Sequence, residues 1–224
     1  KQAEELAGRM HLSAEDTDLA RLIALLHDIG RFEQLKRYDS FEPGTMDHAA
    51  YGVKVLFDEG MIRRFLPDDK WDSIIYTAIA HHSDYELPEI SDSQTLLHAK
   101  LIRDEDKLDN CRVKLVDSTS TFINVSEEEL GTQNITQKVY ETVFENKCIL
   151  SADRVTQMDY WVSYIVYFFD INFKESFDII AENDYLNRII DRIPYSNPVT
   201  KEQMENIRVY MQNFINSHTN SQSF

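Results

Sequence analysis

Residues 17–30 read TDLARLIALLHDIG, and this stretch decides both the fold class and the search for a function. Its apolar positions follow helical spacing, at Leu19, Leu22, Ile23 and Leu26. The periodicity predicts an amphipathic helix with one buried face, and Gly30 is expected to stop it, because glycine favours helix C-termini. His27 and Asp28 follow the apolar stripe directly. Two side chains that bind metals or protons are therefore expected beside a hydrophobic core.

Outward from this stretch, the same spacing of apolar residues continues to the end of the chain. Helices are expected from about Asp47, after Pro67, over about 93–113 and through most of the C-terminal half. Residues 31–46 are expected to form a long ordered loop, and residues 117–135 the weakest-packed stretch. Only 6 Gly and 5 Pro occur in 224 residues, which disfavours tight hairpins. The sequence thus predicts an all-α protein.

We expect two parts, a helical metal-binding core over 1–115 and a helical region over 116–224 that packs against it. The net charge of −16 repels phosphate backbones and argues against a nucleic-acid groove. The longest apolar run, 160–169, is far shorter than the roughly 20 residues of a membrane span. Two isolated cysteines, Cys111 and Cys148, favour a reduced, cytoplasmic setting. No phosphate-binding glycine motif occurs in the sequence.

Histidines and aspartates gather at the ends or inward faces of four expected helices. Burying such side chains costs on the order of several kcal/mol unless they are paired or bind a metal. Imidazole and carboxylate donors suit Mn, Fe, Co, Ni or Zn, and no cysteine stands among these donors, which argues against a thiolate zinc site. A metal site on a helical scaffold is therefore expected. Its candidate side chains are His27, Asp28, His48, His81, His82 and Asp106.

Four segments, in this order, resemble the HD-domain metal-dependent phosphohydrolases: His27-Asp28-Ile-Gly-Arg31, Asp47-His48-Ala-Ala-Tyr-Gly52, His81-His82 and Asp104-Glu-Asp106-Lys107-Leu-Asp109. The resemblance covers roughly residues 1–113 and implies an HD-type helical metal core. It also implies a set of metal ligands. These are His27, Asp28 and Asp106 for the core, with His48, His81 and His82 completing a second metal site.

Two departures from the family pattern qualify what the resemblance implies. The family's first His should stand on the preceding helix, but residues 1–5 contain none, and His11 is too close to His27. We expect that this ligand lies upstream of Lys1, because residues 1–6 resemble the middle of a helix. No Gly-Tyr-Pro follows His82, so the cyclic-dinucleotide members of the family are not supported.

The resemblance implies hydrolysis of a small phosphorylated metabolite or nucleotide by metal-activated hydroxide. One or two divalent ions are expected, with Mn or Fe favoured over Ni, Co, Mg or Zn. Asp28 is expected to bridge two cations, which lowers the pKa of the water between them. Lys107 is the first candidate to hold a phosphate oxygen, and Arg31 is the second. The sequence is compatible with a homo-oligomer and does not require one.

Two other functions fit the same residues. HD-type sites also support mixed-valent di-iron oxygenases that cleave C–C or C–P bonds, and the ligand set does not separate them from hydrolases. A regulatory module that binds a nucleotide without turnover is the third interpretation, which loss of a ligand from the native chain would favour. The substrate, the metal and the oligomeric state are not decided by the sequence.

Overall fold

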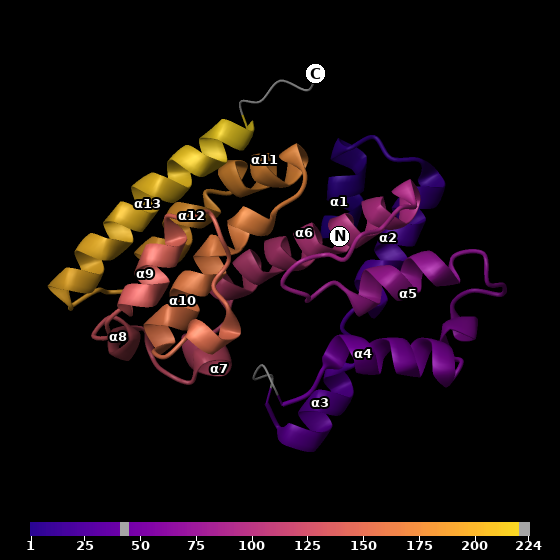
Figure 1. Cartoon of the computed structure of the whole chain (residues 1–224), viewed down its shortest axis with the longest axis horizontal. Helices are drawn as coiled ribbons and strands as arrows, with labels where there is room; N and C mark the ends of the chain where they lie inside the picture. Colours follow the sequence, from indigo (N-terminus) through magenta and orange to yellow (C-terminus); the bar gives the residue numbers. More distant parts are fainter. Residues whose placement is uncertain (41–44, 220–224) are drawn as a thin grey trace. The chain divides into compact units, whose positions relative to one another are not determined.

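A computed structural model describes residues 1–40 and 45–219 (Figure 1). These residues form helices, turns and loops, and none of them lies in a β-strand. This confirms the all-α prediction. Throughout the same described ranges, no helix combines the length and the apolar character that crossing a membrane requires.

The chain forms two compact units, Lys1–Asp106 and Lys107–Phe224. The division falls within helix α6 (Ser93–Val116). The boundary predicted after residue 115 lies near the end of the same helix, and it stays a prediction.

The first unit is built around an apolar core that α2 and α5 share. α1 packs on α2, α2 packs on α5, and α4 packs on both α3 and α5. Leu26, Leu56 and Ile79 are among the fully or nearly fully buried residues of this core. Besides the first part of α6, the unit contains α1 (Gln2–Arg9), α2 (Ala14–Leu26), α3 (Arg31–Tyr38), α4 (His48–Val53), the π-helix η1 (Lys54–Asp58), the 3-10 helix η2 (Met61–Arg64) and α5 (Asp72–Ala80).

Two helix starts in the first unit follow from local chemistry. The Ser13 hydroxyl accepts a hydrogen bond from the backbone N–H of Asp16 and caps α2. The Asp47 carboxylate accepts one from the N–H of Ala50, at 2.9 Å, and caps α4. Each bond satisfies a donor that the first turn of a helix leaves without an intrahelical partner. The predicted start of a helix near Asp47 is confirmed.

The prediction of a loop over 31–46 is wrong for its first half, which forms α3. This helix has no buried apolar stripe, and Phe32 is largely exposed. It is held by an ion pair between Glu33 and Arg37 at 2.7 Å, and by the buried Gln34, which donates to the Thr45 hydroxyl at 2.8 Å. A polar contact of this kind leaves no hydrophobic periodicity to detect. Residues 41–44 lie outside the described part of the chain.

The second unit has an aromatic-rich core, in which Trp161 and Phe168 are fully buried. The long helix α13 packs along α11 and α12 (Figure 1). The stretch 117–135 is better packed than expected, since it contains two short helices and the buried Leu130. The helices of this unit are α7 (Thr119–Ile123), α8 (Glu127–Leu130), α9 (Gln137–Val143), η3 (Ser151–Asp153), α10 (Gln157–Val166), η4 (Tyr167–Asp170), α11 (Lys174–Glu182), α12 (Tyr185–Asp191) and α13 (Pro198–Thr219).

Candidate metal centre

The turn between α2 and α3 carries the first two site residues. α2 ends at Leu26, so His27 is its C-cap and Asp28 lies in the turn that follows. Gly30 does not act as a left-handed helix stop, because its φ is −68°. Instead, a Cβ at this position would lie 2.0 Å from the backbone oxygen of His48. Glycine is therefore required for the close approach of this turn to the start of α4.

Asp28 lies among three imidazole rings from different parts of the first unit. Its Oδ1 is 3.3 Å from Nε2 of His48 and 3.6 Å from Nε2 of His82. Its Oδ2 is 3.6 Å from Nε2 of His27. Within the described chain, His27, Asp28 and His82 form a compact metal-ligand set, whose donor atoms lie within 4.8 Å of one another. The two oxygens of one carboxylate thus face different histidines.

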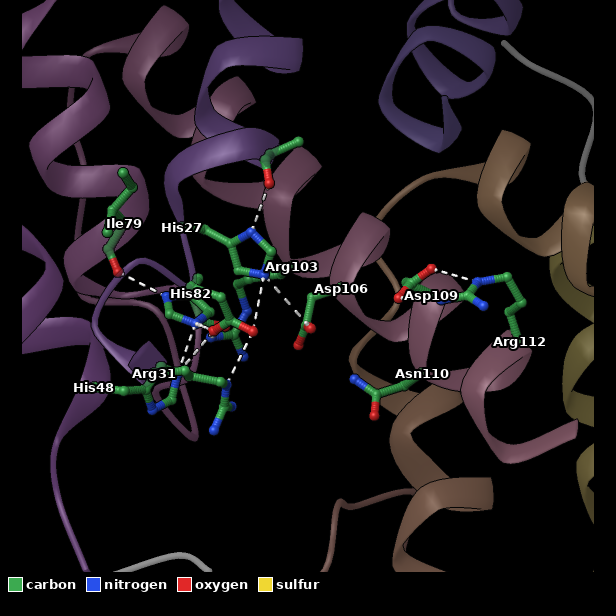
Figure 2. Close-up of polar contacts among 12 residues, drawn as sticks. His27, Arg31, His48, Ile79, His82, Arg103, Asp106, Asp109, Asn110 and Arg112 are labelled. Carbon is green, nitrogen blue, oxygen red and sulfur yellow. Dashed lines mark hydrogen bonds and ion pairs between the residues drawn. The ribbon is translucent and has the colours of Figure 1, made fainter. Parts of the chain in front are cut away.

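His48 and His82 present their Nε2 atoms to each other at 3.0 Å. His82 Nδ1 lies 2.7 Å from the carbonyl oxygen of Ile79 and must donate a proton to it (Figure 2). The lone pair of neutral His82 is therefore on Nε2, toward Asp28. Two ligands at a right angle, each about 2.1 Å from a metal, are about 3.0 Å apart. Burial, and to a smaller degree Arg31, lower the pKa of His48 and favour its neutral, ligating form.

His27 joins Asp106 of α6 to the group. Its Nδ1 donates to the carbonyl oxygen of Ala24 at 2.9 Å, and its Nε2 is 3.8 Å from Asp106 Oδ1. Burial disfavours the charged form of His27, but Asp106 and Asp28 outweigh it and raise its pKa to about 9. Two carboxylates around one imidazole attract a positive charge. That charge can be a proton or a metal ion, and a metal ion displaces the proton.

The carboxylate of Asp28 is better suited to contact a metal ion than to contact the protein groups around it. Its Oδ1 is buried and accepts no hydrogen bond of good geometry. Burial works against its charge, but the rings of His48 and His82 outweigh it, so the pKa of Asp28 lies well below the ordinary range. A buried, charged oxygen with no hydrogen bond is costly unless a cation contacts it. The imidazole and carboxylate donors present here fit a divalent metal.

The structure separates the two adjacent histidines, which the sequence analysis assigned together as ligands. His82 joins Asp28, but the Nδ1 of His81 is 2.6 Å from the carboxylate of Asp84 at a partly exposed position. The expectation placed both rings inward by extending the helical spacing of α5. That extension fails because α5 ends at Ala80. We therefore assign His82, and not His81, to the centre.

The two predicted phosphate-binding cations lie in different surroundings. The Nε of Arg31 donates to Asp28 Oδ2 at 2.9 Å, so this guanidinium is beside the centre (Figure 2). Lys107 follows Asp106 in α6, but its ammonium group is buried in an ion pair with Asp170 of η4, at 2.6 Å. Neighbouring residues of a helix point about 100° apart, so adjacency to Asp106 does not bring Lys107 to the same place.

The sequence analysis did not identify two buried polar residues near the centre. Gln34 is buried and accepts from Arg31 at 3.4 Å, which fixes the guanidinium from its far side. Arg103, one helical turn before Asp106, is also buried. No periodicity marks either residue, because polar side chains inside a helical pattern read as surface positions. A buried position flanked by apolar residues, as at Leu101, Ile102 and Arg103, is the one signal that was available.

An all-α unit that gathers three histidines and two aspartates from four segments has the donor set of a candidate metal site on a helical scaffold. Residues 1–111 match the family model described as “HD domain”. Residues 1–111 therefore belong to the HD-domain family, whose members bind divalent metals and form a superfamily of metal-dependent hydrolases. Searches among curated proteins and among solved structures gave no significant match.

Proposed function

We propose that this protein hydrolyses the phosphate ester of a small metabolite or nucleotide, with one or two divalent cations held by the HD-type centre. One observation carries the proposal. The oxygens of Asp28 face two sides, with His27 next to Oδ2 and with His48 and His82 next to Oδ1. A carboxylate in this arrangement can be shared by two cations and reduce their repulsion.

Each ligand residue has a defined part in holding the cations. His27 and His82 offer their Nε2 lone pairs, because the Nδ1 atom of each donates to a backbone carbonyl. Asp28 and Asp106 supply the negative charge that a divalent ion requires. When bound, the cations lower the pKa of coordinated water and offset the charge of a phosphoryl group.

Arg31 is the cation best placed to orient the substrate. Its side chain is one-third exposed, so a phosphoryl oxygen can approach it from solvent. Asp28 and Gln34 fix its guanidinium on two sides. A planar guanidinium binds two phosphoryl oxygens at once, which favours one orientation of the ester. The ammonium group of Lys107 is paired with Asp170. Its role as a phosphate ligand stays a prediction.

The test begins with the metal content of the full-length protein, purified aerobically and anaerobically. Protein stripped with chelator and reloaded with Mn, Fe, Ni or Zn should show a raised melting temperature, because the ion binds only the folded state. Each reloaded form is then assayed with phosphomonoesters and phosphodiesters in an anaerobic chamber. Phosphate release without oxygen supports hydrolysis.

Other results would favour the rival functions. Substrate loss that requires iron and dioxygen, with no phosphatase activity on any metal, identifies an oxygenase. Tight binding of a nucleotide without turnover on any metal identifies a regulatory module. A melting temperature that no metal changes would contradict the metal site itself.

A further inference from the structure

Arg103 is a buried arginine that holds the turn after α5. Its guanidinium donates to the carbonyl oxygens of Asp84 at 2.6 Å and of His81 at 3.0 Å. Longer contacts reach the carbonyl oxygens of His82 at 3.4 Å and of Tyr85 at 3.5 Å. Only 2% of the residue is exposed to solvent. One planar group therefore binds the backbone at four positions of a five-residue segment.

This arrangement suits the end of a helix. α5 ends at Ala80, so the carbonyls that Arg103 contacts belong to the residues just beyond it, near a helix C-terminus that carries partial negative charge. A guanidinium has five N–H groups in one plane and can satisfy several of these carbonyls together. Nη1 makes three of the four contacts and Nη2 makes the fourth, to Tyr85. A lysine has no second nitrogen to reach Tyr85, and its ammonium group lacks the fixed plane of a guanidinium.

The turn that Arg103 holds is the one that carries His82. Backbone contacts at His81, His82 and Asp84 fix the direction in which the His82 ring leaves the chain. Arg103 itself lies on α6, three residues before Asp106. The same side chain thus ties the segment of one metal ligand to the helix of another.

We propose that Arg103 is a positioning residue of the metal centre, which sets the distance between His82 and Asp106 without contacting the metal. The inference rests on the metal site of the proposed function. Its expected consequence has a distinctive sign. Simple electrostatics says that loss of a nearby positive charge tightens the binding of a cation, because repulsion falls. If Arg103 positions the ligands, its removal instead weakens the binding of the cation.

The experiment measures the dissociation constant of Co²⁺ alone, in chelator-stripped protein, together with the visible absorption of the bound cobalt. Arg103→Met should weaken binding about 10- to 100-fold, the usual cost of losing a group that orients a ligand. Arg103→Lys should lie between this variant and the wild type. Both variants should change the cobalt spectrum, since the ligand geometry changes.

Two control variants separate positioning from charge and from general destabilisation. Arg112→Met removes an exposed arginine of the same helix, which pairs with Asp109, and should leave the dissociation constant within about twofold. Ile62→Ala removes part of the apolar core without touching the turn, and should lower the melting temperature while metal affinity is kept. All measurements are made well below the melting temperature of every variant.

Each outcome decides the inference. Unchanged or tighter binding in Arg103→Met overturns it, and so does equal weakening in Ile62→Ala. If Arg103→Met does not fold, Arg103→Lys decides: a wild-type dissociation constant and cobalt spectrum overturn the inference. A wild-type protein that binds no Co²⁺, Mn²⁺ or Zn²⁺ contradicts the proposed function instead, and is recognised before any variant is compared.

Discussion

Asp28 and Asp159 are aspartates of the two units with opposite surroundings. Asp159, in the first turn of α10, is fully buried and accepts hydrogen bonds from the backbone N–H groups of Thr136, Val155 and Thr156, at 2.8 to 3.0 Å. Asp28 has a buried Oδ1 that accepts no hydrogen bond of good geometry. Both carboxylates bear the cost of burial, but only Asp159 is fully compensated by the backbone.

The difference distinguishes a structural carboxylate from a ligand. Asp159 ties the segment before α9 to the start of α10, and its Oδ2 completes a capping box with Thr156. Asp28 faces imidazole nitrogens at 3.3 to 3.6 Å instead. Such spacing leaves room for a cation between the donors. The two aspartates should therefore respond to mutation in opposite ways.

The largest effect is expected from Asp28→Asn. Loss of the shared negative charge should abolish metal binding and lower turnover about 1000-fold or more, beyond the 100- to 1000-fold cost of one stabilising donor in other enzymes. Metal titration and a thermal shift with Mn²⁺ check this. Asp18→Asn, at an exposed position of α2, is the matched control and should keep both. A metal-induced thermal shift that survives in Asp28→Asn would contradict the assignment.

Asp159→Ala should lower the stability of the protein and leave its metal affinity unchanged. Three buried N–H groups lose their acceptor, which should lower the free energy of unfolding by about 3 kcal/mol or more. Urea denaturation measures this loss, and the metal affinity of the folded variant should equal that of the wild type. Asp178→Ala, which removes a partly exposed ion pair with Lys174, should cost less than about 1 kcal/mol. Equal losses in the two variants would remove the contrast with Asp28.

A pair of glycine substitutions sharpens the comparison around Asp28. Gly30→Ala places a methyl group against the backbone oxygen of His48, and should cost about 1–3 kcal/mol and weaken metal binding. Gly8→Ala adds a methyl group where nothing lies within 4 Å, in the interior of α1. It should raise stability by about 0.5–1 kcal/mol and leave the metal unaffected. Calorimetry and metal titration of both variants test this.

The smallest effect concerns His98, a buried histidine of α6 that lies apart from the centre. Its Nε2 is 3.2 Å from the carboxylate of Asp16. Burial lowers the pKa of His98. As the pH falls below about 6.5, the unfolded state therefore binds a proton that the folded state resists, and stability decreases.

Hydrogen bonds from Ser13 and Gln94 lower the pKa of Asp16, so its contribution is lost only in strong acid, below its ordinary value of 3.8. The pH window from 7.5 to 5.5 thus excludes the titration of Asp16. Urea unfolding should show a smaller loss of stability over this window in His98→Gln than in the wild type. Equal losses in the two proteins would show that His98 does not resist protonation in the folded state.

Much of the fold was predictable because its causes are local. The spacing of apolar residues gave the helical class, and the helix expected from about Asp47 begins there, with Asp47 as its cap. The order of His27-Asp28, His48 and Asp106 pointed to the family that the comparison then found. These signals depend on a few neighbouring residues or on residue type, so they survive without tertiary information.

The remaining features depend on contacts between distant segments. α3 lacks an apolar stripe and is held by Gln34 and by an ion pair, so its helical state was missed. Gly30 has the backbone angles of an ordinary helical residue, and its requirement comes from the His48 carbonyl. Lys107 follows the candidate ligand Asp106 in sequence but pairs with Asp170 of η4, far along the chain.

The sequence by itself determined that this protein is helical, and that its first half carries the histidines and aspartates of an HD-domain metal centre. The tertiary structure alone decided which of two adjacent histidines lies beside Asp28, because α5 ends at Ala80 and helical spacing no longer predicts direction beyond it. It also decided that Arg103 holds the turn after α5. A side chain's direction at a helix end is set by the partners that its backbone meets, and those partners come from elsewhere in the chain.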